Sequence, residues 1–178
     1  VPAALAKSVE YPCLWLRGLL PHHFTEIPET ASPTNELKYL FVNPQEVYWG
    51  SGTFYGDASG GAFSKYPTLR RCGVAIAQID DQGNLVWAMY SNLPGKVQTV
   101  PRGELYALLQ VVTRLLPDSC ISFVTDNQKN AETFNEGEAK ASTSVNCDLC
   151  KVIFNSIRNK RLNVSVKWMP SHLADEED

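Results

Sequence analysis

The chain has 178 residues, of which 44% are hydrophobic and 20% charged, and its formal net charge is −3. These values are typical of a soluble globular protein with a real core, and they exclude a disordered or fibrous chain. No apolar run approaches the ~18 residues that a membrane helix needs, so we expect no membrane partner. The five cysteines are odd in number and scattered, which favours an intracellular location, cytoplasm or nucleus, over a disulfide framework.

The first fifty residues carry six of the eleven prolines and show no sustained hydrophobic period. Proline fixes the backbone and removes a hydrogen-bond donor, so this composition favours a connecting segment. We therefore predict an N-terminal extension or interdomain connection at residues 1–50 and a folded domain at residues 51–178. The chain opens on Val1 and stops inside an acidic run, as expected of a fragment of a longer polypeptide.

From residue 53 onward, apolar strands alternate with amphipathic helices. We expect strands at residues 53–59, 73–79, 85–90, 120–126 and 162–170. We expect helices at residues 100–117, 127–136 and 146–159, with a polar loop at 137–145 and Asn146 as a helix cap. Three strands in a meander, followed by strands interleaved with helices, indicate an α/β fold. Its mixed five-stranded sheet would carry helices on both faces.

Three carboxylates take comparable positions in this predicted fold. Asp57 ends the first strand, Glu104 lies in the first turn of the long helix, and Asp126 ends the strand at 120–126. Reactive groups gather at the carboxyl ends of central strands in α/β sheets, so the three side chains converge if these strands are neighbours. A hard divalent cation such as Mg²⁺ would then offset their mutual repulsion.

Each acid also has a purely structural interpretation. Asp57 suits a turn before two glycines, Glu104 suits the positive end of a helix dipole, and Asp126 suits a helix cap. Their joint placement is what favours a metal site. Cys147 and Cys150 form a lone CxxC without a second pair, so we interpret them as buried helix residues.

Five segments follow one another along the domain in an order that matches a known family: "YGDASGG", "TVPRGELYAL", "FVTDNQ", "NCDLCKVI" and "VKWMPSHL". In order and spacing they resemble the type 1 ribonuclease H (RNase H) domain, of the kind carried by reverse-transcribing retroelements. The resemblance covers residues 53–178 and leaves residues 1–50 unexplained.

The resemblance implies a metal-dependent endonuclease that hydrolyses the RNA strand of RNA–DNA hybrids, as one domain of a larger reverse-transcriptase polyprotein with a polymerase domain upstream. It implies two Mg²⁺ ions, for which Mn²⁺ can substitute. The metal ligands that it implies are Asp57, Glu104 and Asp126, which would be catalytic together with the loop histidine His172. The positions that it implies for contacts with the hybrid are Ser59, Thr99 and Gln128.

The sequence also departs from the family pattern. Val100 and Pro101 stand where asparagines are usual, and the family's fourth carboxylate would fall on a last helix, truncated here, beyond Asp178. One alternative is therefore a catalytically silent module of the same fold that binds nucleic acid or protein. DNA strand transfer is a weaker alternative, because it needs its third acid on a helix after the strand that ends at Asp126. A measurement of Mg²⁺ or Mn²⁺ binding distinguishes these hypotheses, because a chain that binds neither cation would favour the silent module.

Overall fold

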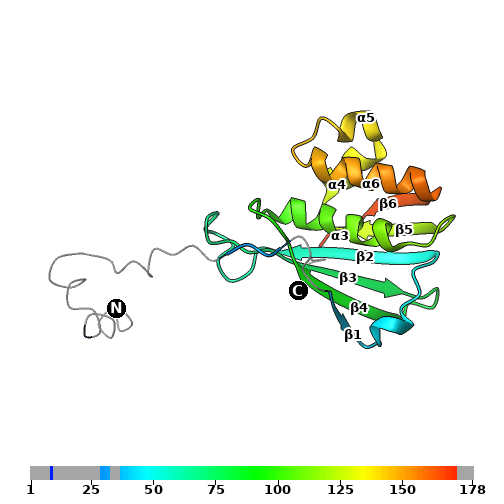
Figure 1. The fold of residues 1–178 in the computed structure, drawn as a ribbon, viewed down its shortest axis with the longest axis horizontal. Coiled ribbons are helices and arrows are strands. Elements are labelled where there is room, and N and C mark those ends of the chain that lie inside the picture. Colours follow the sequence, from blue (N-terminus) through cyan, green and yellow to red (C-terminus); the bar gives the residue numbers. More distant parts are fainter. Residues whose placement is uncertain (1–8, 10–28, 33–36, 172–178) are drawn as a thin grey trace, which may run out of the picture.

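The described residues form a mixed sheet of six strands with helices on one side (Figure 1). The computed structural model describes residue 9, residues 29–32 and residues 37–171. The strands are β1 (Lys38–Leu40), β2 (Gly52–Ser59), β3 (Gly73–Ile79), β4 (Leu85–Asn92), β5 (Cys120–Thr125) and β6 (Asn163–Trp168). Their order is β1-β4-β3-β2-β5-β6. The β2–β3–β4 meander and β1 pair antiparallel, whereas β2–β5 and β5–β6 pair parallel, which confirms the predicted α/β class.

Alternating residues of the meander form one half of the core. Phe54 in β2, Ile76 in β3, and Trp87 and Met89 in β4 are all nearly or fully buried. Trp49, just before β2, packs against this layer, with ring centroids 6.2 Å from Phe54 and 5.0 Å from Trp87. Each large apolar side chain removed from water in this way contributes about 1.5–3 kcal/mol, so the meander is a stable platform for the residues at its end.

The helices are α3 (Val100–Arg114), α4 (Gln128–Asn135), α5 (Glu138–Ala141) and α6 (Cys147–Lys160). Helix α3 packs on β2 and β3, α6 packs on α3, and α4 packs on β6, so these helices lie on one side of the sheet (Figure 1). None of the helices in the described ranges is long and apolar enough to cross a membrane.

The opposite face of the sheet has no helix over it within the described residues. Val86 and Tyr90 in β4 point to this face and are 45% and 42% exposed, and Ala75 of β3 is exposed beside them. We expected helices on both faces, and in the described part of the chain only one face is covered. The predicted last helix, which was to be truncated, follows His172 and so falls outside the described residues.

Strand β1 is the one strand of the six that was not predicted, and it comes from the segment predicted to be an extension. Lys38 to Leu40 pair with Tyr90 to Ala88 of β4, and the short 3-10 helix η2 (Pro44–Glu46) then leads to Trp49. A strand of three residues carries too short a pattern for recognition in the sequence, which is why five strands were expected. The boundary between residues 1–50 and 51–178 stays a prediction, although residues 37–50 contact the sheet.

Two details near α6 differ from the sequence prediction. Helix α5 occupies part of the polar segment 137–145, where a loop was expected, because four residues are too few to show a helical period. Asn146 precedes α6 as expected of a cap, but its side chain makes no capping hydrogen bond. Its Oδ1 accepts a hydrogen bond from Arg102 instead, at 3.2 Å.

The last residue of α6 holds the end of α3. The Nζ atom of Lys160 donates to the main-chain carbonyls of Thr113 at 2.6 Å and Leu115 at 2.9 Å. The final carbonyls of a helix lack partners within the helix and carry partial negative charge, so an ammonium group there is favourable. Helices α3 and α6 are therefore joined by polar contacts as well as by apolar packing.

The cysteines of the described residues are free thiols. Cys150 is buried and Cys147 half-buried in α6, in agreement with their interpretation as helix residues. Burial raises the pKa of the Cys72 and Cys150 thiols, so neither favours the reactive thiolate.

Candidate active site

Three carboxylates meet at the carboxyl ends of β2 and β5. Asp57, Glu104 and Asp126 each offer an oxygen atom, and these atoms all lie within 4.8 Å of one another. Strands β2 and β5 are parallel neighbours, with Tyr55 opposite Val124, so the residues that follow in both strands reach the same edge. The predicted convergence of the three acids is thus present in the structure.

Helix α3 brings Glu104 to this edge because it approaches β2 closely. The residue before Glu104 is Gly103, and a Cβ atom there would lie 2.7 Å from the Cβ atom of Ala58. Any larger side chain would push the start of α3 away from β2. The glycine therefore sets the distance between the helix and the strand that carries Asp57.

Glu104 is held by two hydrogen bonds and is only 2% exposed. Its Oε1 accepts from the main-chain N–H of Ala58 at 2.7 Å, and its Oε2 accepts from the hydroxyl of Thr125 at 3.0 Å. Both donors come from the ends of the strands that carry the other two acids. The carboxylate is therefore fixed in place before any ligand arrives.

Burial raises the pKa of Glu104 from 4.5 to about 8, and the negative charges of Asp126 and Asp57 add to this effect. The hydrogen bonds from Thr125 and Ala58 act in the opposite direction and are outweighed. Without a cation, Glu104 is therefore mostly protonated at neutral pH. A raised pKa in a cluster of like charges is typical of functional carboxylates.

The other two acids face more open surroundings. Asp57 is exposed, and Asp126 is half-buried. Both line a cleft of about 300 Å³ on the uncovered face of the sheet. The indole N–H of Trp168 donates to the main-chain carbonyl of Asp126 at 3.0 Å, so the end of β6 holds the backbone that carries this acid.

This donor set is compatible with divalent metal binding. It consists of oxygen ligands only, and no lysine or arginine in the described part of the chain forms an ion pair with any of the three acids. Hard cations such as Mg²⁺ and Mn²⁺ prefer such ligands. A cation would also stabilise the charged form of Glu104, which burial disfavours.

The residues predicted to contact substrate are less tightly grouped. Ser59 ends β2 two residues after Asp57, and its hydroxyl accepts from the N–H of Gly61 at 3.3 Å. Thr99 precedes α3 and makes no capping hydrogen bond, so its hydroxyl is not used by the helix. Gln128 is exposed, and its amide donates to Glu132 at 2.8 Å. His172 lies outside the described residues, and its role stays a prediction.

Sequence reasoning missed several groups that support the site. Thr125 and the N–H of Ala58 hold Glu104, and Trp168 holds Asp126. The threonine stands directly before the acid in "FVTD", which is the one signal that pointed to it. A main-chain donor such as Ala58 leaves no signal in the sequence.

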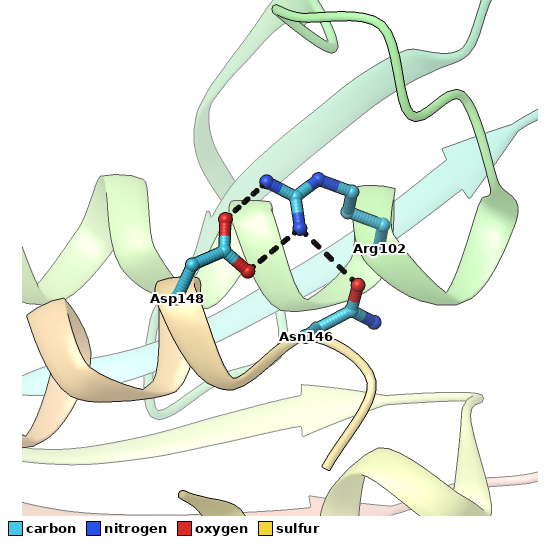
Figure 2. A network of polar contacts seen from close by, with 3 residues as sticks. All are labelled: Arg102, Asn146 and Asp148. Carbon is cyan, nitrogen blue, oxygen red and sulfur yellow. Dashed lines mark hydrogen bonds and ion pairs between the residues drawn. The ribbon is translucent and has the colours of Figure 1, made fainter.

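A further polar network lies beside the start of α3 (Figure 2). The guanidinium of Arg102 donates to both carboxylate oxygens of Asp148, at 2.9 and 2.5 Å, and also to Asn146 (Figure 2). The carboxylate raises the pKa of Arg102, and the guanidinium lowers the pKa of Asp148. This ion pair joins the first turns of α3 and α6, and Arg102 lies two residues before Glu104 in α3.

Comparison with known proteins finds similarity in structure alone. No protein-family model matches the sequence, and no curated protein matches it. A foamy viral protease–reverse transcriptase, solved in complex with an RNA/DNA hybrid, aligns with 86% of this chain at TM-score 0.55 and 15% identity. The alignment covers 21% of the viral protein, so this chain spans about a fifth of its length.

Two smaller solved structures are similar over most of their own length. RNase H1 of the archaeon Halobacterium salinarum NRC-1 aligns with 68% of this chain and 86% of its own, at TM-score 0.50 and 16% identity. The PFV RNase H domain aligns with 72% of this chain and 84% of its own, at TM-score 0.52 and 14% identity. The resemblance first drawn from five sequence motifs is thus confirmed in three dimensions: this chain has the RNase H fold.

Proposed function

We propose that this domain hydrolyses the RNA strand of RNA–DNA hybrids with two divalent cations held by Asp57, Glu104 and Asp126. The observation that carries the proposal is the convergence of these three acids, which each offer an oxygen atom within 4.8 Å of the others, beside the ends of adjacent parallel strands. When bound, such cations supply Lewis acidity and offset the charge of the phosphate. The chain itself contributes a prearranged set of ligands.

The three acids have different parts in this proposal. Glu104 is immobile, because Ala58 and Thr125 hold both of its oxygen atoms, so it fixes where a cation sits. Asp57 and Asp126 line an open cleft, so they remain accessible to a cation and to a phosphate of the substrate. His172, which follows β6 in the sequence, would assist proton transfer or product release.

Three further residues would bind the hybrid. The hydroxyl of Thr99 is not used by α3, and together with Arg70 and Lys129 this residue lines a largely apolar cleft of about 510 Å³. These three polar side chains would hold a backbone phosphate there. Gln128 and Ser59 flank the acids in sequence and would contact the minor groove, where ribose 2′-hydroxyls distinguish RNA from DNA.

We also propose that the domain works within a larger polypeptide that carries a polymerase upstream. The support is the similarity to the foamy viral protease–reverse transcriptase, of which an RNase H fold forms only a part. A separate polymerase domain would add affinity for the hybrid. We also propose an intracellular location, cytoplasm or nucleus, since the cysteines of the described residues are free thiols.

The test is hydrolysis of labelled duplexes by the 178-residue chain in Mg²⁺, in Mn²⁺ and in EDTA. We expect cleavage of the RNA strand of an RNA–DNA hybrid, no cleavage of double-stranded DNA, and no cleavage in EDTA. Asp126→Asn should abolish cleavage, because an amide is a poor, uncharged ligand for Mg²⁺. Asp81→Asn is the matched control, since Asp81 is an exposed acid at the opposite end of β3.

The outcomes separate the candidate functions. Cleavage that Asp126→Asn leaves intact would refute the assignment of the acids. Binding of the hybrid without cleavage and without cation binding would instead identify a silent module of the same fold. Calorimetric titration with Mn²⁺ measures cation binding directly.

A further inference from the structure

The loop of residues 60–71, between β2 and β3, exposes aromatic side chains beside cations. Phe63 is 54% exposed and Tyr66 is 60% exposed, although both are large apolar groups that usually lie inside a protein. Lys65 stands between them, and Arg70 and Arg71 end the loop. The segment from 60 to 71 has no acidic residue. We call this segment the aromatic-basic loop.

The base of this loop is closed and tightly packed. Gly61 has φ +69°, and a Cβ atom there would lie 2.8 Å from the carbonyl oxygen of Arg71, so the two ends of the loop touch. A Cβ atom on Gly60 would lie 2.7 Å from the Cβ atom of Ser64. These close approaches require glycine at both positions, so the sequence is adapted to this loop conformation.

Hydrogen bonds within the loop order the backbone that carries its exposed aromatic residues. The N–H of Tyr66 donates to the carbonyl of Phe63 at 2.9 Å, and the N–H of Arg70 donates to the carbonyl of Tyr66 at 2.8 Å. The Nε of Arg70 donates to the carbonyl of Ser64 at 2.7 Å. Successive turns thus fix the backbone around both rings, which lowers the entropy cost of using them for binding.

The loop lies at the end of the sheet that carries the three acids. It starts directly after β2, whose residues Asp57 and Ser59 belong to the candidate site, and in Figure 1 it extends past the start of α3. The turn between β3 and β4, at the other end of these strands, carries Asp80 and Asp81. The loop itself is therefore basic, whereas the turn at the far end of the meander is acidic, which favours a polyanion near the loop.

We propose that the aromatic-basic loop binds a single-stranded nucleic acid segment that flanks the hybrid, by stacking bases on Phe63 and Tyr66. The faces of bases inside a duplex are covered by their neighbours, whereas unpaired bases offer them to aromatic side chains. Lys65, which stands between the two rings in the sequence, attracts the backbone phosphates of this segment. This proposal rests on the proposed function, and it adds a preference for hybrids that end in a single-stranded tail.

The experiment compares the affinity of one chain for a blunt hybrid and for the same hybrid with a short oligo(dT) or oligo(U) tail at either end. Asp126→Asn is the parent, so that no substrate is cleaved during the measurement. We expect the best tailed hybrid to bind roughly 5- to 100-fold more tightly than the blunt one, as one or two stacked bases would give. In Phe63→Ala/Tyr66→Ala this ratio should fall close to one.

The matched control is Phe41→Ala. Phe41 is 78% exposed and follows β1, near the end of the sheet that is far from the acids, so its loss should leave the ratio as in the parent. A circular dichroism melt of each variant confirms that it is folded. If the double variant does not fold, the single variants Phe63→Ser and Tyr66→Ser are measured in its place.

Two results would overturn the proposal: a ratio near one in the parent, or a ratio that the double variant does not change. An unchanged ratio with equal weakening of blunt and tailed hybrids would place the loop on the duplex. These results are independent of cleavage. If the wild-type chain fails to cut hybrids but prefers tails through the loop, the proposed nuclease is wrong while the binding surface stands.

Discussion

Glu104 makes the stability of the metal-free protein depend on pH in an unusual direction. Its pKa rises from 4.5 to about 8 on folding, so between these values the folded chain holds a proton that the unfolded chain releases. The stabilisation by this proton is fully present below pH 4.5, decreases as the pH rises, and is lost above about pH 8. Most carboxylates in ion pairs have the opposite effect.

The magnitude follows from the width of this interval. Each unit of difference between the folded and the unfolded pKa corresponds to about 1.4 kcal/mol of unfolding free energy, so the full difference corresponds to up to about 5 kcal/mol. For a protein of this size, 1 kcal/mol changes the Tm by about 2–4 °C, which gives a decrease of about 10–20 °C. Because Glu104 is only 2% exposed, solvent screening reduces this value little.

The assay is a series of thermal melts in EDTA at pH values from about 5 to 9, for the wild type and for Glu104→Gln. Glutamine keeps an acceptor for one of the two hydrogen bonds from Ala58 and Thr125, but it does not titrate. We expect the variant to be the more stable protein above about pH 8, and its Tm to change less with pH. Parallel curves for the two proteins would refute the raised pKa. Saturating Mg²⁺ should remove most of the wild-type decrease, because a cation stabilises the charged carboxylate.

Three further predictions concern neighbouring parts of the fold. Gln98→Leu should lower the free energy of unfolding by about 3 kcal/mol in a denaturant titration. The buried Gln98 side chain accepts a hydrogen bond from the N–H of Cys72 and donates to the carbonyls of Leu93 and Gly95. A change below about 1 kcal/mol would contradict this prediction. Arg102→Met should cost only about 1 kcal/mol in the same titration, because its partner Asp148 is 58% exposed. His172→Ala should slow turnover by about 10- to 100-fold without changing the Kd for Mn²⁺, whereas weaker Mn²⁺ binding would make His172 a ligand.

The strands and the three acids could be predicted because their signals are local. The strand at 73–79 has the same bounds in the structure, since an apolar run between turn residues is sufficient to define it. The convergence of Asp57, Glu104 and Asp126 could be predicted because each stands at the end of a recognisable element. Strand β1 was missed because its stability comes from pairing with β4 and not from its own three residues.

The interactions that hold the site could not be predicted in the same way. Ala58 and Glu104 are 46 positions apart, as are Arg102 and Asp148, and neither pair shares a local pattern. The exposed aromatic loop was also missed, because Phe63 and Tyr66 resemble core residues when only the sequence is considered. Such features depend on how α3, α6 and the meander pack together, which residue types alone do not specify.

The double attachment of α3 to α6 constrains how the length of these helices can change. Arg102 binds Asp148 where both helices begin, and Lys160 binds Thr113 and Leu115 where both end. One inserted residue would turn the rest of either helix by about 100° and advance it by about 1.5 Å, so one attachment would break while the other held. Insertions and deletions within α3 or α6 should therefore be tolerated less well than in exposed connections that lie outside this matched pair.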